Sequence, residues 1–149
     1  VKALVRKRKE EWERYHSFDP PFIVRSDGKT FSHPEHRPQE AGVLRGTAAC
    51  SGKATGKARV ILDPKEGCTF NKGEILVALH TDPGWTPLFL TAQALVMEVG
   101  GVLSHAAIVA REYGIPAVVG VRDATKFISS GDEITVDGDR GAVLLRARQ

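Results

Sequence analysis

Residues 94–121 read ALVMEVGGVLSHAAIVAREYGIPAVVGV, and this stretch decides the fold. The apolar run at 94–99 is short, which is typical of a strand that is covered on both faces. A second short apolar run follows at 117–121. The segment between the two runs predicts a helix over 105–113. The stretch therefore indicates a βαβ unit with a right-handed crossover.

The ends of the predicted helix are marked by local signals. Ser104 is a favourable N-cap residue immediately before His105. Gly114 follows the helix at the position where a left-handed residue usually ends one, and Pro116 prevents its continuation. His105 is therefore expected in the first turn of a helix.

The remainder of the chain after residue 41 predicts further strands and a mostly β-sheet domain of the α/β class. Residues 51–56 are interpreted as a loop between two strands, and 133–145 as a β-hairpin with its turn at 137–141. A short helix is expected from residue 86 or 87 to residue 92. The strands predicted outside the βαβ unit cover 43–49, 57–62, 74–80, 133–136 and 142–145.

Residues 1–40 differ in character from the rest. Residues 1–17 predict a charged helix, and 18–40 contain Pro-Pro, Asp-Gly and His-Pro breaks that predict a linker, with a short strand at 22–24. We therefore divide the chain into an upstream helix and linker at 1–40 and one domain at 41–149. The chain begins at Val1 rather than methionine, so we expect a part of a longer protein.

Composition excludes several classes of protein. The chain has 149 residues, of which 42% are hydrophobic and 26% charged, as in globular domains. The formal net charge of +3 comes from a cluster of basic residues at 2–14, which is interpreted as a solvated helix face. No apolar run approaches the ~20 residues that span a bilayer. The two cysteines form no CxxC pair, which favours a reduced, cytoplasmic protein, although one disulfide is not excluded.

His105 has the chemistry of a covalent phosphoryl carrier. The positive end of a helix favours a neutral imidazole, whose free nitrogen is nucleophilic. The same end stabilises an anion, because the first-turn amides lack partners within the helix. Gly100 and Gly101 would allow the backbone to approach a phosphate, and Ser104 could donate its hydroxyl. The arrangement suits nucleophilic catalysis, but a first-turn histidine is also common as an ordinary surface residue.

Residues 100–112 and 114–120 together resemble the motif of the mobile, phosphohistidine domain of the phosphoenolpyruvate-utilising enzymes. That family includes phosphoenolpyruvate synthase, pyruvate phosphate dikinase, enzyme I of the sugar phosphotransferase system and rifampicin phosphotransferase. In its motif the histidine is phosphorylated, and this histidine matches His105. The resemblance extends over 41–145 and implies a swivelling β/β/α architecture.

The resemblance also implies cofactors and partners. ATP and magnesium would bind a partner domain of the same parent protein, and an acceptor substrate would bind another. The chain itself has no P-loop, nucleotide fingerprint or acidic metal cluster, so we expect it to bind no cofactor alone. It would be the phosphoryl-carrier domain of a multidomain, ATP-dependent phosphotransferase that does not complete turnover by itself. The linker at 19–38 is the expected hinge.

One departure from the family's pattern concerns the acceptor. Leu103 stands where many members have threonine, a regulatory phosphorylation site in the plant dikinases, so that control is not expected here. Leu103 and the order of helix, linker and histidine domain favour a rifampicin phosphotransferase-like protein. Two acceptors stay open: pyruvate, as in the synthase, and a drug hydroxyl.

Other candidate residues have weaker support. Thr81 is expected either to reach the phosphohistidine pocket or to cap the short helix that follows it. Arg111 is interpreted as a salt-bridge or helix-dipole residue in preference to a phosphate contact. His33 and His36 lie in a polar, Pro-containing loop without further ligands, so no metal site is expected. Ser104 beside His105 is not a hydrolase dyad, because neighbours in one helical turn point apart.

Two other classes of function remain as alternatives. The chain could be a non-catalytic interaction module that kept the swivelling fold and lost the chemistry, although Gly101, Ser104 and His105 are all present. It could also bind nucleic acid through its basic N-terminal segment. No basic stripe with aromatic residues follows that segment, so we expect no nucleic-acid partner and no membrane partner.

Overall fold

The structure is a computed structural model that describes residues 2–16, 23–31, 42–63, 65 and 70–146. The chain divides into two compact units, Val1–Glu35 and His36–Gln149. The predicted division between residues 40 and 41 lies outside the described residues and stays a prediction.

The described residues of the first unit, 2–16 and 23–31, form one helix and one small hairpin. Helix α1 spans Lys2–His16, which confirms the predicted charged helix. Strands β1 (Ile23–Val24) and β2 (Thr30–Phe31) pair antiparallel, so the short strand expected at 22–24 is present. Most of the expected hinge at 19–38 lies outside the described residues.

The second unit is built on an eight-stranded mixed sheet with the order β3-β10-β9-β5-β6-β7-β8-β4. Strands β5 to β8 are parallel to one another, and the remaining pairs are antiparallel. The strands are β3 (Val43–Arg45), β4 (Thr47–Cys50), β5 (Lys53–Val60), β6 (Ile75–Ala78), β7 (Ala94–Met97), β8 (Ala117–Val119), β9 (Glu133–Asp137) and β10 (Ala142–Leu145).

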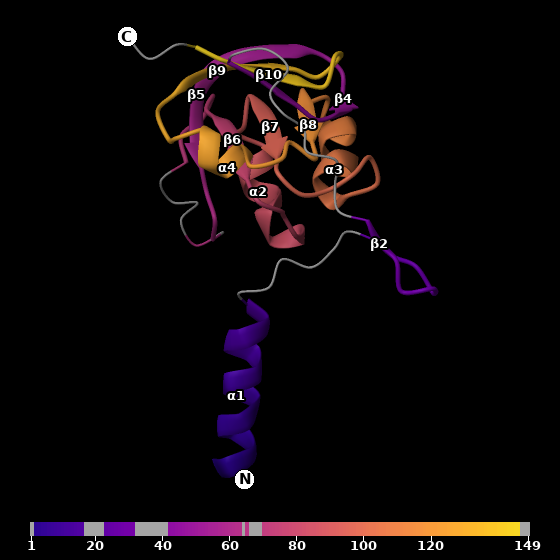
Figure 1. The fold of residues 1–149 in the computed structure, drawn as a ribbon. Coiled ribbons are helices and arrows are strands. Elements are labelled where there is room, and N and C mark those ends of the chain that lie inside the picture. Colours follow the sequence, from indigo (N-terminus) through magenta and orange to yellow (C-terminus); the bar gives the residue numbers. More distant parts are fainter. Residues whose placement is uncertain (1, 17–22, 32–41, 64, 66–69, 147–149) are drawn as a thin grey trace. The chain divides into compact units, whose positions relative to one another are not determined.

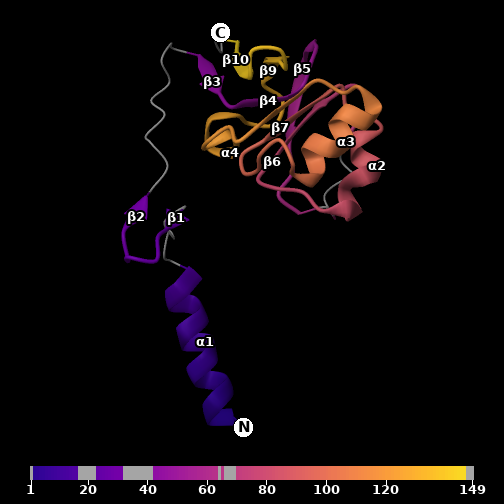
Figure 2. The same cartoon turned by 90° about the vertical axis from the view of Figure 1, so that its right-hand side faces the viewer.

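Strand β5 connects two layers of this sheet. Its first half, Lys53–Lys57, pairs with β9, and its second half, Ala58–Val60, pairs with β6. The layer of β3, β9 and β10 therefore lies over one face of β6, β7 and β8 (Figures 1 and 2). Helices α2 (Thr86–Phe89) and α3 (His105–Tyr113) cover the opposite face. The result is the β/β/α arrangement that the family resemblance implies.

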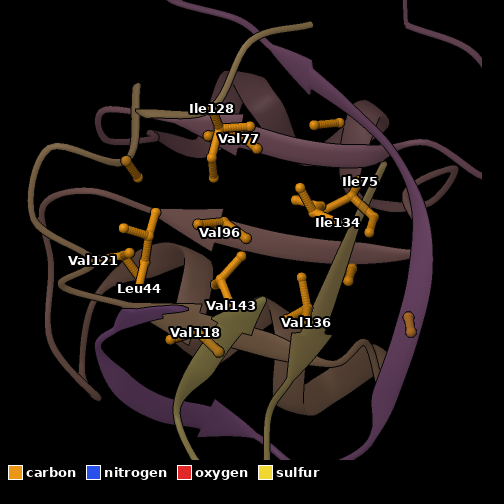
Figure 3. Close-up of a cluster of buried hydrophobic side chains, with 14 residues drawn as sticks. Leu44, Ile75, Val77, Val96, Val118, Val121, Ile128, Ile134, Val136 and Val143 are labelled. Atoms are coloured by element: carbon orange, nitrogen blue, oxygen red, sulfur yellow. The ribbon is translucent and has the colours of Figure 1, made fainter. Parts of the chain in front are cut away.

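The central strands supply both cores because their side chains alternate between faces. In β6, Ile75 and Val77 point into the core between the two strand layers, whereas Leu76 and Ala78 point into the core beneath the helices. All four are fully buried. Figure 3 shows the first core, in which Val77 and Val96 lie across from side chains of the overlying layer. The residues of that overlying layer are Leu44, Ile134, Val136 and Val143.

Two predicted elements differ from the observed ones. The single strand expected at 43–49 is split at Gly46, because β3 pairs with β10 and β4 pairs with β8. A Cβ on Gly46 would lie 2.7 Å from the carbonyl oxygen of Val119, so only glycine fits at this crossing. The loop expected at 51–56 is wrong, since β5 begins at Lys53.

The segment that follows α3 differs from the prediction in two respects. The strand expected at 117–121 ends at Val119. A four-residue helix, α4 (Ala124–Phe127), follows it and had no counterpart in the prediction. The Glu98 carboxylate accepts bonds from the Thr125 backbone N–H (2.9 Å) and hydroxyl (2.6 Å), so α4 is attached to the end of β7 by a side chain.

Candidate functional site

The β7–α3–β8 unit holds His105 at the first position of helix α3. The helix has the predicted bounds, His105–Tyr113, with Ser104 at the N-cap and Gly114 in the left-handed conformation at φ 67°. Its small residues Ala106, Ala107 and Ala110 are buried against the sheet. These packed alanines fix the axis of the helix and thereby the place of His105.

The backbone at the start of α3 presents free donors. The first intrahelical bond runs from the Ile108 N–H to the Ser104 carbonyl (3.0 Å). The N–H groups of His105, Ala106 and Ala107 precede it and have no acceptor within the helix. An anion near His105 would therefore meet the positive end of the helix dipole.

The two glycines of the preceding loop have different roles. Gly100 has φ +135°, and a Cβ there would lie 3.1 Å from the Ser104 hydroxyl oxygen. Nothing lies within 4 Å of a Cβ built on Gly101. Gly100 is therefore required by conformation and by space, whereas Gly101 leaves open room beside the loop.

Three polar side-chain atoms of the described residues are buried without a hydrogen-bond partner: Thr81 Oγ1, Ser104 Oγ and His105 Nε2. The Ser104 side chain makes no capping bond to the helix, so its N-cap position is confirmed but its expected capping bond is absent. Buried polar atoms normally have partners, and groups of exceptions require an explanation. All three belong to residues that the sequence places in the site.

Thr81 and His105 lie at the same edge of the sheet. Thr81 follows β6, His105 follows β7, and these strands are parallel neighbours. The Val99 N–H donates to the Leu79 carbonyl (2.8 Å), which continues the pairing beyond the strand ends. Asp82 caps a short 3-10 helix, η2 (Pro83–Trp85), and its carboxylate accepts from the Gly84 N–H (2.8 Å). Helix α2, which follows, has Trp85 at its N-cap and no capping bond from a side chain. Of the two roles weighed for Thr81, capping is therefore taken by its neighbour.

Phe89 is a site residue that the sequence did not reveal. It ends helix α2, is fully buried, and its ring centroid lies 6.0 Å from that of the His105 imidazole at an interplanar angle of 36°. It forms an apolar wall on one side of the histidine. Its spacing in the sequence gave no signal for this contact.

Arg111 contacts backbone carbonyls. Its guanidinium donates to the carbonyl oxygen of Val102 (2.7 Å) in the loop before His105 and to that of Ala49 (3.2 Å) in β4. No carboxylate within the described part of the chain pairs with it, so the expected salt bridge is not found.

Exposed apolar side chains occur just before and just after the start of α3 in the sequence. Leu103 is 82% exposed, and Val99, Val102 and Ile108 are each about half exposed. We call these four residues the apolar collar. Exposed apolar side chains that gather on a surface commonly mark a site that another protein domain covers.

No cluster of metal-ligating side chains occurs among the residues that the structure describes. His33 and His36 lie outside those residues. Within the same described ranges, no helix has the length and apolar character needed to cross a membrane. Cys50 is a free thiol, and Cys68 is outside the described residues.

Comparisons with known proteins agree with this geometry. Residues 70–141 match the family described as the PEP-utilising enzyme, mobile domain. The chain is 45% identical over 143 residues to rifampicin phosphotransferase of Bacillus cereus. This alignment covers 94% of this chain and 16% of that protein. It is 55% identical over 107 residues to a probable phosphoenolpyruvate synthase of Staphylothermus marinus, which covers 70% of this chain and 13% of that protein.

A solved structure shares the fold. Aconitase X of Thermococcus kodakaraensis aligns with a TM-score of 0.54 at 20% identity, over 70% of this chain and 98% of that one. At this identity the likeness concerns the fold alone. The curated relatives are much longer, and this chain spans about a sixth of the length of the rifampicin phosphotransferase. Residues 70–141 form the sheet edge and the helix that hold His105, and over these residues the chain carries the mobile domain of the PEP-utilising enzymes.

Proposed function

We propose that His105 is phosphorylated and that this domain delivers the phosphoryl group from ATP, bound elsewhere in its parent protein, to an acceptor. The single observation that carries the proposal is the group of buried, unpartnered atoms Thr81 Oγ1, Ser104 Oγ and His105 Nε2. Two hydroxyls and the amides at the start of α3 are donors that a phosphoryl group on the histidine could satisfy.

The chemistry consists of two transfers at phosphorus with a hydrolysis between them. A lone pair of a His105 imidazole nitrogen attacks the β-phosphorus of ATP and forms the N–P bond while the bond from that phosphorus to the AMP oxygen breaks, and that oxygen keeps the electron pair. The γ-phosphate that is still attached is then released to water as inorganic phosphate, which leaves one phosphoryl group on the ring. In the last step an acceptor oxygen attacks and loses its proton to solvent, the N–P bond breaks and its electron pair returns to the imidazole. The ring alternates between free and phosphorylated states without net change.

Burial of Nε2 adds a condition to the first step. The atom has almost no accessible surface in the structure, so a phosphoryl donor cannot reach it along the required line. We propose that Nε2 is the nucleophile and that the ring turns away from Phe89 before the transfer. Because Nε2 has no hydrogen-bond partner, this movement breaks no hydrogen bond at that atom and gives up only the packing against Phe89.

The parent protein supplies the rest of the reaction. The relative named rifampicin phosphotransferase and the relative named probable phosphoenolpyruvate synthase are both far longer than this chain. We propose that ATP and magnesium bind one part of the parent and the acceptor another, and that the apolar collar is the surface covered when the domain docks on them. Similarity over 94% of the chain favours the rifampicin-type acceptor, a drug hydroxyl, over pyruvate.

The test uses the parent protein with ATP labelled at the β-phosphoryl group, in wild-type form and as His105→Ala. We expect label on the wild type that is stable in base and lost in acid, and none on the variant. Absence of label on a folded wild type, with ATP binding shown separately, would overturn the carrier function. A non-catalytic interaction module would then be the better description.

A further inference from the structure

Arg111 runs back along its own helix toward the reactive end. It lies in the last turn of α3, six positions after His105, and helical side chains point toward the N-terminus of their helix. Its guanidinium reaches Val102 O at 2.7 Å, three residues before His105, and Ala49 O at 3.2 Å. One side chain therefore connects α3, strand β4 and the loop that leads into the helix.

This loop has few other constraints. It contains Gly100 and Gly101, and its backbone is held by the bond from the Ser104 N–H to the Gly101 carbonyl (2.9 Å) and by the first bond of α3, from the Ile108 N–H to the Ser104 carbonyl (3.0 Å). The Ser104 hydroxyl does not cap the helix. The neighbouring side chains Val102 and Leu103 are exposed and give little packing. A charged donor to the Val102 carbonyl is thus a strong link between the loop and the sheet.

We infer that Arg111 is a positioning residue: its two bonds fix the 100–104 loop against β4 and so set the place of Ser104 and His105 for phosphoryl transfer. The inference rests on the proposed function. A planar guanidinium can hold two carbonyls at once, whereas a lysine ammonium with its single nitrogen cannot reproduce that fork. Geometry rather than positive charge is therefore what the site requires at position 111.

The experiment compares the full chain with its Arg111→Lys, Arg111→Gln and Arg111→Ala variants. Arg146→Gln is the control, because Arg146 is an exposed arginine that pairs with Glu133 (2.8 Å) on the edge of another layer. Each protein is treated with phosphoramidate, a small phosphoryl donor, and the rate of acid-labile label on His105 is measured. NMR signals of the amides at 100–104 and of the His105 ring are recorded on the same samples.

We expect Lys, Gln and Ala at position 111 all to slow the reaction by about tenfold, within the roughly 100-fold that a 1 Å misplacement can cause. The loop amide and ring signals should shift in all three, while thermal unfolding stays cooperative and Arg146→Gln matches the wild type. Added guanidinium, well below denaturing concentrations, should partly restore Arg111→Ala, and ammonium should not.

Two results would overturn the inference. A Lys variant that reacts at the wild-type rate beside a slow Gln variant would show that Arg111 acts through its charge on the phosphate. Variants that are less stable but have unchanged rates and unchanged ring signals would show a purely structural role. If the parent protein does not transfer phosphate from ATP, the proposed function fails, yet the loop and ring signals still decide the role of Arg111.

Discussion

Gly138 lies so close to the carbonyl oxygen of Cys50 that a Cβ added to this glycine would approach that oxygen to less than 3.0 Å, a distance that Cβ atoms in proteins essentially never show. Gly138 belongs to the turn between β9 and β10, and its N–H donates to the Gly52 carbonyl (2.8 Å). The Gly52 N–H in turn donates to the Asp139 carboxylate (3.3 Å). The hairpin turn is therefore packed directly on the junction between β4 and β5.

Gly138→Ala is expected to destabilise the domain by about 3 kcal/mol, the upper range for overpacking, because backbone rather than a flexible side chain must move. The measurement is the urea midpoint at constant m-value. Gly101→Ala is the matched control for stability, since nothing lies within 4 Å of its added Cβ, and it should not destabilise. Equal midpoints for Gly138→Ala and the wild type would contradict the tight packing.

The βαβ unit could be predicted because its signals are local. Ser104, Gly114 and Pro116 mark the helix ends, and the flanking apolar runs are covered on both faces. The start of β5 could not, because its buried positions are Ala54 and Ala58, which give a weak alternation among polar residues. A strand whose buried residues are alanines has a weak hydrophobic periodicity and is therefore difficult to recognise in a sequence.

The contacts in the site that could not be predicted from the sequence are contacts between segments that are distant in the chain. His105 was found through its place in the helix and a family motif, but the Phe89 ring comes from a different helix sixteen residues earlier. Arg111 was interpreted as a salt-bridge or helix-dipole residue because its charge is visible in the sequence, whereas its acceptors, the carbonyl oxygens of Val102 and Ala49, are backbone atoms placed by the fold. Residue type therefore predicts the candidate reactive side chain, His105, better than it predicts the residues that surround and position it.

The free energy of unfolding should decrease at acidic pH because the Glu74 carboxylate becomes protonated. Hydrogen bonds from the Arg59 guanidinium (3.0 and 3.2 Å) are the first cause that lowers the pKa of Glu74 below its ordinary 4.5, helped by bonds from Asn71 and opposed by burial. A carboxylate with a lowered folded-state pKa stabilises the fold above pH 4.5, and this contribution is lost as pH falls through the folded value.

We expect Glu74→Gln to lower the unfolding free energy at pH 7 by about 1 kcal/mol, the size of one charged hydrogen bond after allowing for the solvent exposure of Arg59. The difference from the wild type should shrink as the pH falls from 4.5 through the lowered folded-state pKa of Glu74, because the wild-type carboxyl then also becomes neutral. Urea unfolding of both proteins across pH 3–7 measures the difference at pH 7 and its decrease at low pH. A constant difference at all pH values would mean that the ion pair has no part in the acid sensitivity.

The apolar collar predicts an effect on transfer between domains. Leu103→Ser replaces a side chain that is 82% exposed, so the folded state should change by less than about 0.5 kcal/mol. In the parent protein, phosphorylation from ATP should slow by about tenfold, the loss expected for roughly 1.4 kcal/mol of interface contact. The reaction with phosphoramidate should slow less, because a small donor needs no docking surface.

Leu144→Ser is the control for this prediction. Leu144 is also a partly exposed apolar residue, at 39%, but it lies on β10 beside Thr55 and Glu133, away from the collar. It should leave phosphorylation from ATP unchanged. Equal losses in the two variants would assign the effect to general surface polarity and remove the collar from the docking model.

Gly100→Ala tests whether the loop conformation and the chemistry are linked. At φ +135° an alanine is strained by about 1–3 kcal/mol, and its Cβ would press on the Ser104 hydroxyl oxygen at 3.1 Å. The loop is expected to relax by moving Ser104 and thus the first turn of α3, so phosphoramidate labelling of His105 should slow.

Gly73→Ala supplies the comparison, because Gly73 also has a positive φ (+88°) but has open space around its Cβ and lies in the turn before β6. Both variants should lose stability, and only Gly100→Ala should lose reactivity. Equal reactivity would mean that His105 is held by α3 alone and that the glycine serves the backbone turn without serving the transfer.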